Sequence, residues 1–247
     1  MARQPWVAGG AMSTPSTAAA SSTTVDRRIA VVDDHQLLAE SLGMALSVHG
    51  YDVRRIPVPA TGGAPGALVA AVQRIRPRVV LLDLDLGGFG DGGRLLGPLS
   101  RSGIRVVVLT GSIDPPRWGA ALASGASTVV AKSRALNEVI SIVRRANEGL
   151  SVMDGRERDD LIAAWHDRLA RQDADEDRLA RLTPRESEVL AALMDGRSVR
   201  DIAAASVVST ATVRTQVKSI LAKLDVSSQL AAVSLAHRCH WRYPGAA

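Results

Sequence analysis

Residues 79–91 read Val-Val-Leu-Leu-Asp-Leu-Asp-Leu-Gly-Gly-Phe-Gly-Asp, an apolar run that ends abruptly in carboxylates and glycines. A near-continuous apolar run is typical of a parallel strand covered on both faces, and open α/β sheets bind ligands beyond the carboxyl ends of such strands. Asp83 occupies that position, and the glycines after it allow a ligand to approach the backbone closely. Alternatively, Asp83 and Asp85 only mark the solvent-exposed end of a strand. The other strand ends of the domain decide between these interpretations.

Composition favours two soluble domains in a reducing compartment. The chain has 247 residues, and 46% hydrophobic residues with 3% aromatics indicate cores built from Ala, Val, Leu and Ile. No apolar run approaches the roughly 20 residues that a membrane span needs. The single cysteine, Cys239, excludes an intramolecular disulfide. We therefore expect a cytoplasmic protein without membrane contact.

Charge divides the chain into segments. Residues 151–180 carry 5 basic and 9 acidic side chains, whereas residues 181–247 carry 9 basic and 5 acidic ones. Because an acidic segment separates two basic ones, we predict a domain over 27–149, a charged and partly helical linker over 150–180, and a second domain over 181–247. Residues 1–26 lack the charged and apolar regions of a secretory signal, and we expect a disordered leader there.

Short apolar runs alternate with helical patterns along the first domain. The expected strands cover residues 29–32, 51–56, 78–82, 104–109 and 127–131, and the expected helices cover residues 37–48, 67–75, 95–99, 118–123 and 136–147. Such alternation predicts an α/β fold with a five-stranded parallel, doubly wound sheet and helices on both faces.

Polar side chains follow four of these strands. The first strand ends in Asp33 and Asp34, the third in Asp83, the fourth in Thr110 and the fifth in Lys132. Because the carboxyl ends of parallel strands meet at one edge of a sheet, the acids, the hydroxyl and the amine converge there. A single Thr or Lys after a strand is usually a solvated loop residue, but four strand ends of this kind indicate a site.

This order resembles the receiver domain of bacterial response regulators, which has a flavodoxin-like fold. The resemblance implies that a sensor histidine kinase phosphorylates Asp83, and that Mg²⁺ is held by Asp33, Asp34 and Asp83. It also implies that Thr110 and Lys132 are the family's switch hydroxyl and lysine. The chemistry agrees, since a phosphoryl dianion approaches carboxylates only if a hard cation offsets the repulsion. Lys132 can pair with one phosphoryl oxygen and Thr110 can donate a hydrogen bond to another.

Three positions depart from the receiver pattern. Gly87 stands where the family usually has proline, and the pair Asp91-Gly92 comes one residue late, so we expect a longer and looser loop. Val129 stands where an aromatic switch residue is common, so the usual rotamer coupling cannot operate. One alternative is therefore an atypical receiver regulator whose DNA binding is independent of phosphorylation.

An enzyme is the second alternative. Asp83-Leu84-Asp85, Thr110 and Lys132 also resemble the first three motifs of haloacid dehalogenase-like phosphatases, which depend on Mg²⁺. Those enzymes need an acid pair after the lysine, whereas the later pair here, Asp159-Asp160, lies in a charged helical pattern. We therefore predict that the chain is not an enzyme.

An amphipathic helix is predicted within the charged linker. Leu161, Ile162, Trp165 and Leu169 lie at helical spacing there. The segment is either a solvated connector or a helix whose apolar stripe packs on one domain or on a partner chain. The sequence leaves both interpretations open.

The second domain begins with a strong helix start. Thr183 is the expected N-cap, Pro184 takes the first helical position and Glu186 completes a capping box. Two further helices follow, the second capped by Ser209. Apolar stripes that predict the three helices consist of Val189, Leu190 and Leu193, then Val199, Ile202 and Ala203, then Val213, Val217, Ile220, Leu221 and Leu224.

These helices resemble the helix-turn-helix domain of LuxR/FixJ type. The segments that match are Leu182-Thr183-Pro184-Arg185-Glu186, Asp201-Ile202-Ala203, Thr212-Val213-Arg214 and Ile220-Leu221-Ala222-Lys223-Leu224. The resemblance implies that the third helix enters the major groove of double-stranded DNA. The residues expected to contact DNA are Thr212, Arg214, Thr215 and Lys218. A fourth helix over residues 228–238 implies a homodimer.

Both resemblances together predict a two-component response regulator of the NarL/FixJ family, controlled by phosphorylation of Asp83 and regulating transcription. Gln216 and Ser219 replace a histidine and an asparagine common in this family, and we expect them to alter DNA contacts. The sequence does not reveal the cognate kinase, the signal, the DNA target, or whether transcription rises or falls.

Overall fold

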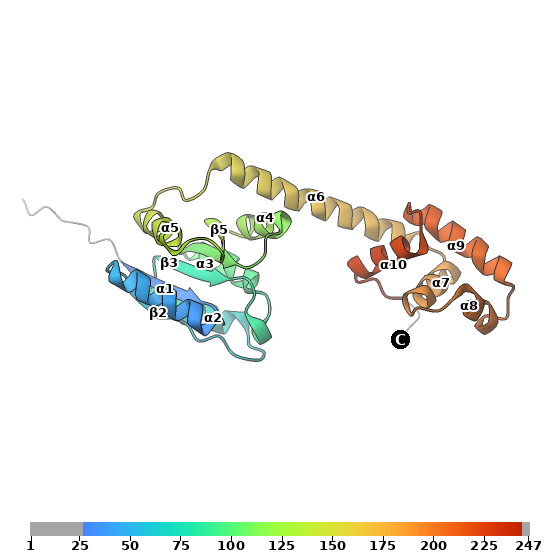
Figure 1. Cartoon of the computed structure of the whole chain (residues 1–247), viewed down its shortest axis with the longest axis horizontal. Coiled ribbons are helices and arrows are strands. Elements are labelled where there is room, and N and C mark those ends of the chain that lie inside the picture. Colours follow the sequence, from blue (N-terminus) through green and yellow to red (C-terminus); the bar gives the residue numbers. More distant parts are fainter. Residues whose placement is uncertain (1–26, 244–247) are drawn as a thin grey trace, which may run out of the picture.

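The computed structural model describes residues 27–243, and the predicted leader, residues 1–26, lies outside the described residues. An N-terminal α/β domain and a C-terminal helical domain are joined by one long helix (Figure 1). Within the part of the chain that the structure describes, no helix combines the length and the apolar character needed to cross a membrane.

A parallel sheet of five strands forms the centre of the first domain. The strands are β1 (Arg28–Val32), β2 (Asp52–Arg55), β3 (Val79–Asp83), β4 (Arg105–Thr110) and β5 (Thr128–Ala131). Their order is β2-β1-β3-β4-β5, and all neighbouring pairs are parallel. β3 is buried along its whole length between β1 and β4, which explains its unbroken apolar run. The predicted five-stranded parallel sheet is confirmed.

Helices cover both faces of this sheet (Figure 1). They are α1 (Gln36–Val48), α2 (Pro65–Ile75), α3 (Leu96–Arg101), α4 (Pro115–Ala123) and α5 (Leu136–Glu148), and two short 3-10 helices, η1 (Gly87–Phe89) and η2 (Gly92–Leu95), follow β3. Side chains alternate along a strand, so Val80 and Leu82 share a core with α2, α3 and α4. Val79 and Leu81 share the opposite core with α1 and α5. The domain is therefore doubly wound, with one hydrophobic core on each face.

A single helix, α6 (Gly155–Ala180), connects the two domains. The Asp154 side chain caps its start by accepting hydrogen bonds from two backbone N–H groups. Leu161 and Ile162 pack against the first domain, and Leu179 is buried in the core of the second. The helix predicted from apolar spacing is therefore present, and the first part of its apolar stripe packs on the first domain, whereas Leu169 remains 38% exposed. It is also longer than predicted, because it continues through the acidic residues 173–177.

Four helices form the second domain: α7 (Pro184–Met194), α8 (Val199–Ala205), α9 (Thr210–Leu224) and α10 (Gln229–Arg238). Their apolar faces meet in one core, which includes Leu190, Ile202 and Ile220. The predicted capping box of Thr183 and Glu186 is present at the start of α7. This capping fixes where the helices begin, and the apolar stripes fix which faces turn inward.

The turn between α8 and α9 holds a β-branched residue in the left-handed region of backbone space. Val207 has a φ of 53°. Its side chain is 92% exposed, so no packing offsets the steric cost. For a residue other than glycine this conformation costs about 1–2 kcal/mol.

We expect V207G to stabilise the second domain by about 1 kcal/mol, because removal of the clash outweighs the roughly 0.5–1 kcal/mol of added unfolded-chain entropy. Amide hydrogen exchange of α9 in the full chain measures this free energy of unfolding. Val208, whose φ is negative, provides the matched control, and V208G should lower the stability. A V207G variant no more stable than the wild type would contradict the strain at this turn.

Candidate functional sites: an acidic pocket and a basic helix

The ends of β1, β3, β4 and β5 meet at one edge of the sheet, because their register aligns them. Asp33, Asp83 and Thr110 are buried there, with exposed fractions of 8%, 2% and 0%. Asp34 is exposed and Lys132 is partly exposed. The structure therefore brings together all five residues predicted from the strand ends.

The ammonium group of Lys132 lies between two buried carboxylates. Its Nζ is 2.7 Å from Asp83 Oδ2 and 2.8 Å from Asp33 Oδ2. Asp33 Oδ2 nevertheless accepts no well-aligned hydrogen bond from the residues that the structure describes. Thr110 takes no part in this contact, because its Oγ1 accepts a hydrogen bond from the Ser112 backbone N–H at 3.1 Å. Asp33 Oδ2 can therefore still accept a further partner, as an oxygen that binds a cation must.

Burial and ion pairing shift the pKa values of this cluster. Burial raises the pKa of Asp83, and the hydrogen bond from Lys132 offsets only part of that effect. Burial acts to lower the pKa of Lys132, but the close contacts of its ammonium with the Asp33 and Asp83 carboxylates outweigh it, so this pKa is raised. Lys132 therefore stays protonated near neutral pH. The pocket thus gathers three aspartates around one lysine, and this excess of acidic groups favours a further cation.

His35 is a fourth potential metal ligand that the sequence pattern does not predict. Its Nδ1 lies 3.0 Å from Asp34 Oδ1 and 3.2 Å from Asp33 Oδ1. That nitrogen and one oxygen each from Asp33, Asp34 and Asp83 all lie within 4.8 Å of one another. A cavity of about 670 Å³ opens beside Asp33 and Asp34. The available signal is the position of His35 directly after the acid pair.

The loop after β3 is closely packed, so the expectation of a loose loop is wrong. Gly87 has a φ of 53°, and a Cβ there would lie 2.6 Å from Asp34 Oδ2. Glycine in place of the family's proline therefore makes room for this carboxylate. The Gly92 N–H donates to Leu84 O at 2.9 Å and closes the loop. The number of glycines in a loop does not predict backbone hydrogen bonds of this kind.

Asp85 connects the loop to α4. Its backbone N–H donates to Asp83 Oδ1 at 3.1 Å, and its carboxylate forms an ion pair with Arg117. The hydrogen bond from Arg117 holds the pKa of Asp85 below its ordinary value. No neighbouring residue in the sequence indicates that the Asp85 side chain has a partner on α4.

In the second domain, Glu186 fastens α9 to α7. Its carboxylate accepts hydrogen bonds from Ser219 Oγ and Lys223 Nζ, both at 2.6 Å, and from the Thr183 N–H at 2.8 Å. Although burial acts to raise the pKa of Glu186, the hydrogen bonds from Lys223 and Ser219 lower it to about 2. Ser219 is thus an interior contact of the domain, which argues against a direct role in DNA contacts.

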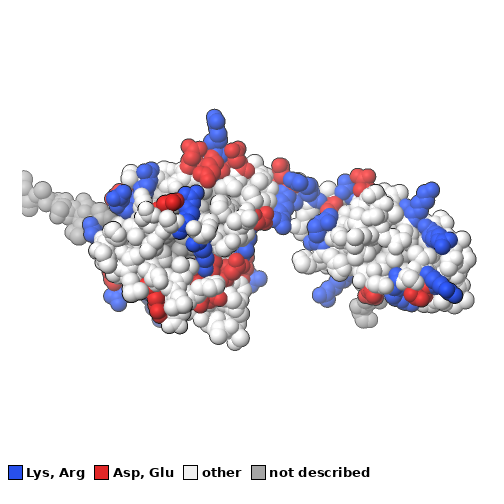
Figure 2. All heavy atoms as spheres, viewed as in Figure 1, with Lys and Arg blue, Asp and Glu red and all other residues white. Residues whose placement is uncertain are grey.

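The opposite face of α9 is exposed and basic. Lys and Arg atoms lie over α8 and α9 at the far end of the domain (Figure 2). Four residues predicted to contact DNA are exposed on α9: Thr212, Arg214, Thr215 and Lys218. Within residues 27–243, neither Arg214 nor Lys218 has an ion-pair partner. Arg214 and Lys218 are therefore available to an external polyanion. Gln216 differs from them, because its Oε1 is buried and has no partner among these residues.

The phosphatase arrangement is not present among the described residues. Asp159 and Asp160 are exposed on α6. Neither belongs to the group of donor atoms that gathers around Asp83. The acid pair after the lysine therefore supplies nothing to the pocket.

A five-stranded receiver-like sheet followed by a helix-turn-helix domain is the domain arrangement of DNA-binding response regulators. Comparison with protein families gives the same two domains. The family described as "Response regulator receiver domain" matches residues 29–144. The family described as "Bacterial regulatory proteins, luxR family" matches residues 180–236. Together these matches cover more than half of the chain. The chain belongs to the response regulators that join a receiver domain to a LuxR-type helix-turn-helix domain.

Among its relatives is the transcriptional regulatory protein LiaR of Bacillus subtilis. The two are 26% identical over 215 residues, which cover 86% of this chain and 98% of LiaR. The response regulator protein VraR of Staphylococcus epidermidis is 27% identical over 209 residues, covering 83% of this chain and 94% of VraR. A solved structure of RcsB from Salmonella enterica serovar Typhimurium is 23% identical, with a TM-score of 0.44, covering 85% of this chain and 97% of that one.

We expect E186Q to lower the free energy of unfolding of the second domain by about 2–3 kcal/mol at pH 7. The folded-state pKa of about 2 lies below the ordinary value of 4.5, so the carboxylate stabilises the fold above about pH 4.5. This contribution is lost as the pH falls from about 4.5 to about 2, where variant and wild type should converge.

Urea unfolding of the full chain, followed by NMR signals of α9 at several pH values, measures the difference. E188Q is the matched control, because Glu188 forms an exposed pair with Arg185 and should cost at most about 1 kcal/mol. A difference between E186Q and wild type that does not change with pH would refute the electrostatic explanation.

Proposed function

We propose that the protein is a two-component response regulator whose receiver accepts a phosphoryl group on Asp83 and whose helix-turn-helix domain binds DNA. The observation that carries the proposal is the convergence of Asp33, Asp83 and Lys132 at the ends of three buried strands. A carboxylate held beside an ammonium in a negative, cation-favouring pocket suits acceptance of one phosphoryl group. Such a site forms one acyl phosphate per chain and needs no multiple-turnover chemistry.

Each side chain has a distinct task in this proposal. An Asp83 carboxylate oxygen attacks phosphorus, so that an O–P bond forms while the bond from phosphorus to the donor breaks. Lys132, protonated because of its raised pKa, pairs with one phosphoryl oxygen. Thr110 turns its hydroxyl to donate a hydrogen bond to another. The phosphodonor in the cell is a sensor histidine kinase.

Asp33, Asp34 and Asp83 suit a hard divalent cation such as Mg²⁺. They offer oxygen donors in a net negative pocket, and Asp33 Oδ2 has no well-aligned hydrogen bond within the described residues. When bound, Mg²⁺ offsets the repulsion between the phosphoryl group and the carboxylates. His35 offers nitrogen, which Mg²⁺ seldom uses, so we assign the cation to the three aspartates.

The basic face of α9 supports the DNA-binding half of the proposal. Arg214 and Lys218 are exposed without ion-pair partners in the described chain, and Thr212 and Thr215 lie on the same face. A helix of this kind fits the major groove, where Arg and Lys reach phosphates or base edges. We propose that α10 forms a homodimer contact, since Leu230 on it is 75% exposed.

One observation favours a second candidate function, an atypical receiver that controls DNA binding without phosphorylation. Val129 is 5% exposed and packed in the core, so β5 offers no aromatic ring that could change rotamer. DNA affinity measured with and without beryllofluoride, a phosphoryl mimic, separates the two candidates. An affinity that does not respond to the mimic favours the atypical receiver.

We expect D83N to abolish labelling by acetyl phosphate in the presence of Mg²⁺, because the amide is not a nucleophile at phosphorus. Intact-mass spectrometry of the full chain counts the phosphoryl groups. D85N, a change at the neighbouring exposed aspartate, is the control and should be labelled like the wild type. A phosphoryl group still present on D83N would show that the acceptor lies elsewhere.

We expect K218A and R214A each to weaken binding to promoter DNA by about 3- to 10-fold and to reduce the salt dependence by about one unit of slope, if both side chains contact phosphates. Fluorescence anisotropy at several salt concentrations measures both quantities. R101A, a change at an exposed arginine on α3, controls for net charge. Equal slopes for K218A, R214A and R101A would remove α9 from the interface.

A further inference from the structure

α4 lies between the phosphoacceptor loop and the linker helix. It packs side by side with the first half of α6 (Figure 1). At Gly119 the contact is backbone to backbone, because a Cβ there would lie 2.0 Å from Leu161 O and 2.9 Å from Trp165 Cβ. Glycine alone permits this approach. A displacement of α4 therefore displaces α6 with it.

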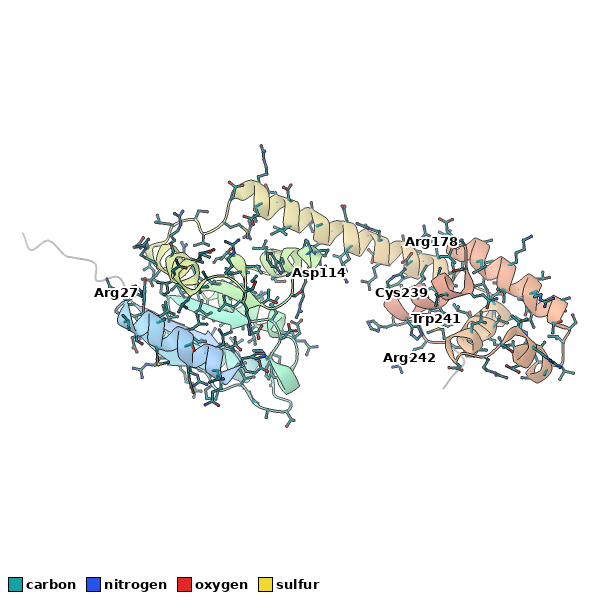
Figure 3. All side chains as sticks on the ribbon, in the orientation of Figure 1. Arg27, Asp114, Arg178, Cys239, Trp241 and Arg242 are labelled. Atoms are coloured by element: carbon teal, nitrogen blue, oxygen red, sulfur yellow. The ribbon has the colours of Figure 1, made fainter. Side chains whose placement is uncertain are left out.

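Polar contacts fix α6 at both ends of α4. Arg168 Nη1 lies 2.6 Å from Oδ2 of Asp114, the N-cap residue that Figure 3 shows at the end of α4 beneath α6. Arg158 donates to Leu122 O at 2.9 Å and to Ala126 O at 3.1 Å. Leu122 lies in the last turn of α4, and Ala126 follows shortly after the helix ends at Ala123. The two helices are thus antiparallel and joined at the start, middle and end of α4.

Arg117 joins the same helix to the phosphoacceptor. It pairs with Asp85, whose backbone N–H donates to Asp83 Oδ1 at 3.1 Å. The Asp85 and Arg117 side chains are 59% and 35% exposed, so their pair contributes little to stability. Its position matters more, because a phosphoryl dianion on Asp83 carries twice the charge of the Asp85 carboxylate and competes with it for the guanidinium.

A second connection to α4 starts at Thr110. Its Oγ1 accepts from the Ser112 N–H at 3.1 Å, and Ser112 O accepts from Trp118 Nε1 at 2.8 Å. When the Thr110 hydroxyl turns to donate to a phosphoryl group, its oxygen is no longer aligned to accept the hydrogen bond from the Ser112 N–H. The turn that holds Trp118 on α4 must then rearrange. The end of β3, through Asp85, and the end of β4, through Thr110, are thus both connected to α4.

α6 carries this displacement into the second domain. It is one continuous helix of 26 residues, which spans about 39 Å at 1.5 Å per residue. Leu179 near its end is 3% exposed within the core of the second domain. Asp175 pairs with Arg238 of α10, at 3.4 Å. A small rotation where α6 contacts α4 is therefore amplified along the helix.

We propose that Arg117 is a positioning residue that couples phosphorylation to the linker helix. The Asp85–Arg117 pair holds α4 and the attached α6 in place while Asp83 is unmodified. Phosphorylation of Asp83 draws Arg117 away from Asp85, so that α4 and α6 shift together and move the helix-turn-helix domain. This inference rests on the proposed function, the acceptance of a phosphoryl group by Asp83.

Spin labels on both domains test the coupling in the full chain. Exposed sites for the labels are Ala70 on α2 and Asp195 after α7, introduced as A70C and D195C in a C239S background. Pulsed electron paramagnetic resonance then measures the distribution of distances between the two labels, with and without beryllofluoride and Mg²⁺. Mass spectrometry counts the phosphoryl groups after treatment with acetyl phosphate. We expect the mimic to shift the distribution in the otherwise wild-type chain.

In R117A we expect at least half of this shift to be lost at an unchanged level of Asp83 labelling. R117K, which keeps the charge, should restore most of it. R54A, which breaks an exposed ion pair within β2, is the matched control and should respond fully. A full shift in R117A would overturn the coupling. Wild-type chain labelled on Asp83 without any shift would overturn the coupling alone, whereas absence of label on Asp83 would overturn the proposed function as well.

G119A provides a second variant that does not touch the pocket. The added Cβ would meet Leu161 O, so α6 must move away from α4. We expect the distance distribution to shift without beryllofluoride and the labelling of Asp83 to remain. A distribution in G119A identical to that of the wild type would contradict the role of this contact.

Discussion

The sharing of one ammonium group by two buried carboxylates is the constraint on which the receiver depends. Asp33 and Asp83 are 8% and 2% exposed, and charges so deeply buried are tolerated only when they are paired. Lys132 lies within 2.8 Å of both, which requires β1, β3 and β5 to end at the same edge of the sheet. The order β2-β1-β3-β4-β5 meets that requirement. Because Asp34 adds a third carboxylate, the balance remains negative, and the pocket attracts a cation that a neutral pocket would not.

The same edge of the sheet determines how the two domains are connected. β4 ends in Thr110 and leads into α4, and α4 packs against α6, whose far end is buried in the second domain. The sequence predicts a charged and only partly helical linker over residues 150–180, whereas the structure has an unbroken helix over Gly155–Ala180. The charges explain this difference, since Arg158 and Arg168 bind the backbone and the N-cap of α4. Arg158 and Arg168 of the linker helix thus bind the first domain and are not fully solvated.

Sequence patterns predict what depends on strand and helix periodicity. Parallel strands end at one edge, so the amino-acid sequence alone is enough to place Asp33, Asp83 and Lys132 together, and the capping box of Thr183 follows from spacing. Contacts made by helix faces cannot be predicted in this way, because the rotation of a helix depends on tertiary packing. For this reason the sequence does not reveal the role of Arg117 on α4. The expectation of a loose loop after β3 fails because the glycine at Gly87 serves close approach and not flexibility.

Val129, which stands at the family's aromatic position, is packed in the core, and an aromatic ring on another element lies against the same core. Trp118 on α4 packs against the same core as Val129, and its indole N–H bonds to Ser112 O beside Thr110. A ring that changes rotamer needs space that a close-packed core lacks. An exchange of hydrogen bonds at Ser112 needs none, since it gives up a bond worth about 1 kcal/mol for charge-assisted bonds to a phosphoryl group worth about 1.5–3 kcal/mol. A net gain of about 1 kcal/mol changes a two-state equilibrium roughly fivefold, which is enough to bias α4 without any aromatic residue on β5.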